Sequence, residues 1–193
     1  MAEDAPVAPV ESLALDGRRL RVEFLQVGDR YAHHLVAVDA NGSESVLLRS
    51  IELTTDEESL ESPALQSLHV QPLANRDGSL AALVGMSGAS HWSLGVEPDP
   101  AATSPRLIFD AACRIKRNGL VRVASRYARV AEATPADWIR IEPLPTDGQS
   151  AAPFLQTGVE AISVVREIMP ADVAPTTVRW RYAISIPRHT HSR

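Results

Sequence analysis

The sequence predicts an all-β fold, an antiparallel β-sandwich or barrel built from consecutive hairpins. Apolar and polar residues alternate with a period of two along most of the chain, as they do in strands that bury one face. Short runs of Gly, Asn and Asp separate these segments, as turns separate antiparallel strands. The chain has 193 residues, 45% of them hydrophobic, which is enough for one domain with its own core.

The first segments predict a meander of three strands that share one apolar face. These segments are residues 20–24, 34–38 and 46–48. A three-residue loop after the first strand places Phe24 opposite His34. A second three-residue loop places Val36 opposite Val46. In this register His34 lies on the apolar face and His33 on the polar one, because neighbouring residues of a strand point to opposite sides.

Alternation of apolar and polar residues also predicts a hairpin at residues 80–96 and a C-terminal strand at residues 178–186. A three-residue loop places Met86 opposite Trp92, which also turns Val84 and Met86 inward. The most regular pattern lies at residues 178–186, where every second residue is apolar. Trp92 and Trp180 fall on the apolar sides of their strands, so we expect both in the core.

Residues 107–116 and 120–130 predict another hairpin. A two-residue loop would set the apolar face of one strand against the charged face of the other. A loop of residues 117–119 avoids this conflict, with glycine in the left-handed region at its end. Asp110 then faces Arg126 on the outer side of the sheet.

The region before the last strand leaves two alternatives open. Residues 158–169 could form a strand that turns inward Ile162, Val164 and Ile168. They could also form a short helix with one apolar side made by Val159, Ile162, Val165 and Met169. Either element ends at Pro170. Residues 138–141 predict a short strand.

The ends of the chain and its composition suggest a single cytoplasmic domain. We expect a flexible leader at residues 1–10, a single β domain at residues 11–188 and a flexible tail at residues 189–193. The start lacks the basic and apolar regions of a signal peptide, and the lone Cys113 allows no internal disulfide. No apolar run approaches the roughly 20 residues of a membrane span. The net charge of −5 argues against a nucleic-acid binder.

A serine-dependent hydrolase is one hypothesis for the function. Ser87, Ser90 and His91 lie within one tight turn, and a nucleophilic serine needs a nearby histidine to accept its proton. The string lacks the glycine spacing of a nucleophile elbow. Adjacent residues of a strand also point to opposite faces, which separates Ser90 from His91. The serine-dependent hydrolase is therefore the alternative to the binding module described below.

The histidines do not complete a predicted metal site. His33 and His34 point to opposite faces, and the tail adds only His189 and His191. Zinc sites generally need three or four ligands. No phosphate loop, calcium loop or dinucleotide motif occurs, so no cofactor is predicted.

The preferred hypothesis is a non-catalytic binding or interaction module with a patch for an anionic ligand. In the predicted 107–130 hairpin, Arg114 faces Arg122 on the outer side and Lys116 lies next to them. Like charges placed opposite each other are unfavourable unless something neutralises them. An acidic ligand or protein partner could do so through guanidinium hydrogen bonds. The chain's own acidic stretch at 52–61, or water and salt, are the alternatives.

Overall fold

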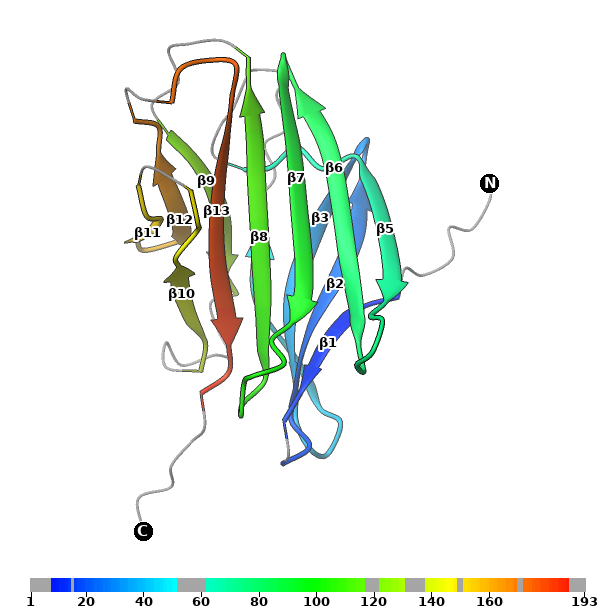
Figure 1. The fold of residues 1–193 in the computed structure, drawn as a ribbon. Helices are drawn as coiled ribbons and strands as arrows, with labels where there is room; N and C mark the ends of the chain where they lie inside the picture. The colour runs from blue at the N-terminus through cyan, green and yellow to red at the C-terminus, as the bar shows by residue number, and fades with distance from the viewer. Residues whose placement is uncertain are drawn as a thin grey trace.

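Two antiparallel sheets stack face to face and form a β-sandwich (Figure 1). The computed structural model describes residues 8–14, 16–51, 62–116, 122–130, 138–148, 151–169 and 172–187. Within these ranges the regular elements are 13 strands, with no helix. The all-β prediction is confirmed, and the sandwich is the form that the sheets adopt.

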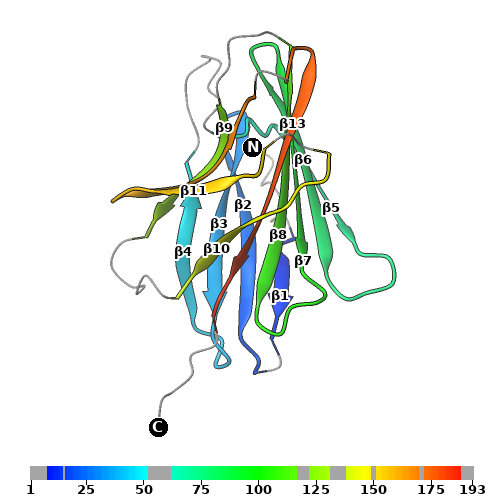
Figure 2. The ribbon, with the colours of Figure 1, turned by 60° about the vertical axis from the view of Figure 1, so that its left-hand side comes forward.

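Each sheet is built mainly from neighbours in the chain. In spatial order, sheet A contains β1 (Val10–Leu13), β2 (Arg19–Val27), β3 (Arg30–Val38), β4 (Glu44–Ser50), β9 (Arg122–Arg129), β12 (Ala161–Glu167) and β11 (Phe154–Thr157). Sheet B contains β10 (Arg140–Leu144), β13 (Thr176–Ser185), β8 (Arg106–Ile115), β7 (Ser90–Pro98), β6 (Ser79–Ser87) and β5 (Ser67–Pro72). Figure 2 turns the molecule so that the two layers are seen more nearly from the side.

The core lies between the sheets and draws apolar side chains from both. One continuous cluster contains the inward-facing residues of β2, β3, β7, β8, β9, β12 and β13. Trp92 and Trp180 are buried and meet edge to face, with ring centroids 6.0 Å apart. Phe109 and Cys113 are fully buried, as the alternation of β8 predicts. The predicted faces of β8 and β13 are therefore confirmed.

Residues 62–66, which precede β5, pack against the core through Leu65, which is buried. The carbonyl of Leu65 accepts a hydrogen bond from the backbone N–H of Tyr31 at 2.7 Å, which ties this segment to sheet A. Gly85 of β6 lies against the same segment. A Cβ atom on Gly85 would stand 1.8 Å from the carbonyl oxygen of Ala64, so this approach requires glycine.

Two hairpin loops are one residue shorter than predicted. Gly28 and Gly88 each stand first in a two-residue loop, with φ of 64° and 55°. Glycine at this position gives a turn whose twist matches that of the strands. The shorter loop pairs Phe24 with His33 rather than with His34, so His33 is the histidine that faces the core. The predicted Val36–Val46 pairing is confirmed, and a bulge follows it.

The shorter loop between β6 and β7 also reverses the predicted face of β6. Ala81 and Leu83 are buried, whereas Val84 and Met86 are 54% and 46% exposed. The prediction that Val84 and Met86 point inward was wrong. Strand β6 carries apolar residues on both faces, so its composition does not distinguish one phase from the other.

The predicted 107–130 hairpin does not form, because its two strands lie in different sheets. Strand β8 pairs with β7 and β13 in sheet B, while β9 pairs with β4 and β12 in sheet A. Asp110 therefore faces Arg181 across the strands rather than Arg126. The predicted loop at 117–119 lies outside the described residues. Period-two alternation identifies which face of a strand is buried but does not identify its partner.

The region at 158–169 forms the strand alternative. Strand β12 turns Ile162 and Val164 into the core, and Val159 is 97% exposed, which a buried helix side would not allow. The predicted strand near 138–141 is present as β10, beginning at Arg140. The tail at 189–193 and most of the leader lie outside the described residues. Strand β1 begins at Val10, the last residue of the predicted leader.

Candidate functional site

The outer face of sheet B, the sheet nearer the viewer in Figure 1, carries polar side chains on β7, β8 and β13. They lie in rows, because the strand pairing places residues of adjacent strands directly side by side. The three rows at one end read His91–Arg114–Thr177, Ser93–Ala112–Arg179 and Gly95–Asp110–Arg181. Small residues thus form the middle of the face, and cationic residues lie around them.

His91, Arg114 and Lys116 form one group, which we call the cationic corner. His91 and Arg114 are direct neighbours on β7 and β8. The ammonium Nζ of Lys116 lies 2.6 Å from Nε2 of His91. Because an ammonium can only donate, this contact requires Nε2 of His91 to be the acceptor. The three side chains therefore sit at one end of the face, within reach of one ligand.

The cations on this face differ in how they are neutralised. Arg179 donates from Nε to Oδ1 of Asp110 at 2.7 Å, and this hydrogen bond raises the pKa of Arg179. Arg181 lies 3.4 Å from the same carboxylate. Arg114 and Lys116 form no ion pair with any carboxylate of the described residues. Arg114 and Lys116 are therefore two neighbouring cations without a carboxylate partner among the described residues.

A shallow hollow of about 450 Å³ adjoins the cationic corner. Arg114, His91 and Thr177 line one part of it, and Val84 and Met86 of β6 line another. The lining thus combines hydrogen-bond donors with an aliphatic surface. Polar and apolar side chains therefore lie side by side in this hollow.

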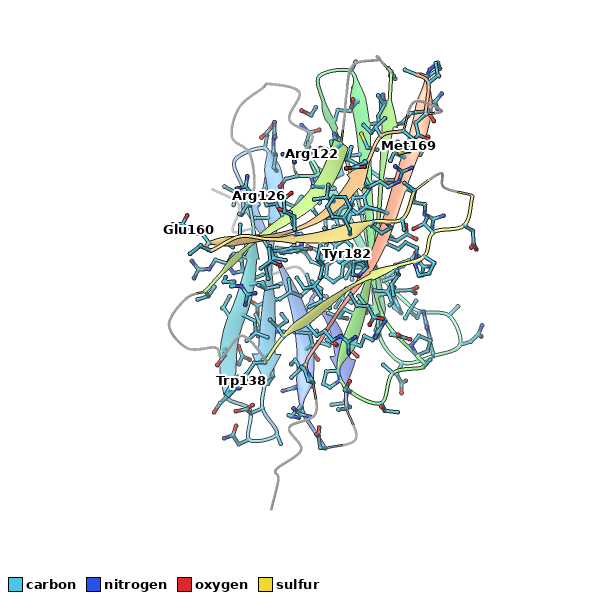
Figure 3. All side chains as sticks on the ribbon, turned by 90° about the vertical axis from the view of Figure 1, so that its left-hand side faces the viewer. Arg122, Arg126, Trp138, Glu160, Met169 and Tyr182 are labelled. Atoms are coloured by element: carbon cyan, nitrogen blue, oxygen red, sulfur yellow. The ribbon has the colours of Figure 1, made fainter. Side chains whose placement is uncertain are left out.

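Arg122 does not belong to this group, which corrects the predicted patch. It lies on β9 in sheet A. Arg114 lies on β8 in sheet B, and Lys116 directly follows β8. Arg122 and Arg126 border a separate hollow of about 430 Å³, which also includes Glu160. Figure 3 shows Arg122 and Arg126 along β9, with Tyr182 between the two sheets. The error follows from the hairpin that does not form.

The serine and histidine side chains considered for catalysis point in different directions. Ser90 is 1% exposed on the inner face of β7, and its Oγ has no hydrogen-bond partner. His91 is exposed on the outer face and contacts Lys116. Ser87 faces Ser90 across the hairpin and is also buried. The described geometry therefore separates Ser90 from His91, the proton acceptor that a hydrolase at this turn would need.

The interior contains a chain of hydrogen-bonded polar side chains that the sequence did not reveal. Nε2 of His33 lies 3.0 Å from the hydroxyl of Tyr127, which lies 2.6 Å from the hydroxyl of Tyr182. Burial lowers the pKa of His33 to about 3, and burial raises the pKa of Tyr182. These groups are buried between the sheets, so we assign them to the core. The signal was hidden because the predicted register turned His33 outward.

Neither a metal cluster nor a membrane-spanning element occurs in the described part of the chain. No three His, Cys, Asp or Glu side chains there gather as metal ligands do. Those same residues contain no helix that is long and apolar enough to cross a bilayer. In comparisons with protein-family models, curated proteins and solved structures, the chain has no significant match.

Proposed function

We propose that the protein is a non-catalytic binding module that holds an anionic group at the cationic corner. The observation that carries this proposal is the pairing state of Arg114 and Lys116. They stand together without a carboxylate partner among the described residues, although the protein has a net charge of −5. Neighbouring like charges are unfavourable, and a bound anion removes this repulsion.

The side chains suit a phosphate or a carboxylate. The guanidinium of Arg114 can donate to two oxygens at once, in the planar geometry that matches these groups. Lys116 adds a point charge beside it. The hydroxyl of Thr177, next to Arg114 on β13, is available as a further donor. Binding of this kind needs no nucleophile and no general base, which agrees with the separation of Ser90 from His91.

Titration calorimetry with inorganic pyrophosphate tests the proposal. The measurement is made at about 150 mM ionic strength, where the field of exposed charges is screened over about 8 Å. The test variant combines Arg114→Gln with Lys116→Gln. The matched control combines Arg122→Gln with Arg126→Gln, which removes the same charge from the outer face of sheet A.

We expect the test variant to bind pyrophosphate at least about tenfold more weakly than the wild type, because it loses charge-assisted hydrogen bonds. The control variant should bind within about twofold of the wild type, since only the distant field changes. An equal loss in both variants would mean that net charge alone governs binding. That result, or no binding to the wild type, would overturn the proposal.

A further inference from the structure

Two exposed aliphatic side chains, Val84 and Met86, lie beside the cationic corner. Val84 and Met86 project from the outer face of β6 and are 54% and 46% exposed. Met86 is the direct neighbour of His91, and Val84 is the direct neighbour of Ser93. Large aliphatic side chains therefore continue the same rows that contain the cations. Their exposure leaves apolar surface in contact with water, which a bound apolar group would cover.

These two aliphatic side chains and Arg114 line the same hollow. It is lined by Arg114, Val84 and Met86 together with the small residues Ser93 and Ala112. The cationic strand β8 and the aliphatic strand β6 are separated by β7 alone, a distance of about 10 Å between strand axes. A ligand whose anionic head contacts Arg114 would extend its body over β7 towards Val84.

We infer that the ligand of the cationic corner is a small amphiphile, a phosphate or carboxylate head with an aliphatic chain. The inference rests on the proposed function and adds the chemical class of the ligand. Arg114 and Lys116 hold the head, and Val84 and Met86 cover the chain. The occupant is a monomeric amphiphile rather than a bilayer, because a single hollow of about 450 Å³ contains both the guanidinium of Arg114 and the aliphatic side chains of Val84 and Met86.

Titration with octyl phosphate and methyl phosphate tests this inference. Both compounds carry the same head and are used below the concentration at which octyl phosphate forms micelles. The test variant combines Val84→Thr with Met86→Gln, which keeps the side-chain size and removes apolar surface. The matched control combines Val27→Thr with Leu25→Gln on β2, where the wild-type residues are 54% and 38% exposed.

We expect octyl phosphate to bind the wild type at least about tenfold more tightly than methyl phosphate. A fully buried methylene strengthens binding by about fourfold, and an open hollow buries only part of the chain. The test variant should lose most of this preference, while the control variant keeps it. Methyl phosphate should bind all three proteins equally, because its contacts are with Arg114 and Lys116.

The possible failures are distinguishable. Equal binding of the two phosphates by the wild type would overturn the amphiphile and leave the anion site in place. Binding to vesicles that contain an anionic phospholipid, without binding to monomeric octyl phosphate, would overturn it in favour of a membrane surface. Failure of both phosphates and of pyrophosphate would overturn the proposed function itself.

Discussion

The outer faces of the two sheets both carry cations, but the surroundings of these cations differ. On sheet A, Arg21 donates to Glu44 at 2.7 Å and to Glu23 at 2.5 Å, so its charge is neutralised by the protein itself. On sheet B, Arg114 and Lys116 have no carboxylate partner among the described residues. The difference teaches that the number of cations does not locate a binding site. The lack of a carboxylate partner is the reason why we propose the anion site at Arg114 and Lys116.

The largest effect is expected where the neutralised charge is buried. Arg166 is fully buried, and its Nη2 donates to Oδ2 of Asp172 at 3.2 Å. Asp172→Ala leaves a cation in the interior without this carboxylate, so we expect the free energy of unfolding to fall by about 3–5 kcal/mol. Urea denaturation measures this change. Glu97→Ala, which removes the partner of the half-exposed Arg76, should cost about 1 kcal/mol or less.

The loss from Asp172→Ala must therefore be clearly larger than the loss from Glu97→Ala. Similar losses would show that the interior does not make pairing more important than the surface does. The contrast between neutralised and uncompensated cations would then lose its physical basis.

A second effect concerns a group that the interior keeps uncharged. Burial lowers the pKa of His33 to about 3, against an ordinary value of 6.5. Between these values the unfolded chain binds one more proton than the folded protein. The free energy of unfolding should therefore fall as the pH drops from 6.5 towards 3, by up to about 1.4 kcal/mol per pH unit.

Urea denaturation at several pH values between 6.5 and 5 measures this slope. His33→Gln keeps a polar side chain but does not titrate, so the slope should be smaller in the variant even if the variant is less stable overall. An unchanged slope would mean that His33 already takes up its proton in the folded protein. Nε2 of His33 would then donate its proton to the hydroxyl of Tyr127.

The smallest effect separates the two outer faces directly. Arg21→Gln removes contacts to neighbouring carboxylates and should lower the free energy of unfolding by up to about 1 kcal/mol. Arg114→Gln removes a charge that contributes no described ion pair and should change it by less than about 0.5 kcal/mol. Thermal or urea denaturation compares the two variants. A larger loss for Arg114→Gln would give this residue a structural role instead of a binding role.

Much of the fold follows from alternation alone, and the limits of that prediction are physical. The buried faces of β8 and β13 were predictable, because every second residue there is apolar and the arginines and Asp110 fall at the positions between them. The register at Gly28 and Gly88 was not, because glycine fits both two-residue and three-residue loops. A change of one residue in loop length moved His33 into the core and turned Val84 outward.

The site was predictable only in part for the same reason. Arg114 and Lys116 lie two residues apart at the end of one strand, so their grouping does not depend on strand partners. The grouping with Arg122 depended on a hairpin, and strand pairing across the chain cannot be deduced from periodicity. The contribution of Val84 and Met86 depended on the phase of β6, which its apolar residues on both faces do not specify.

The most direct test of the central claim is a map of where an anion binds on the wild-type protein. Amide chemical shifts are recorded while inorganic pyrophosphate is added to the isotope-labelled chain. The account predicts that the largest changes fall on His91, Arg114, Lys116 and Thr177, with small changes around Arg21 and Arg122. Changes that are largest on sheet A, or spread evenly over the arginines of both faces, would contradict it.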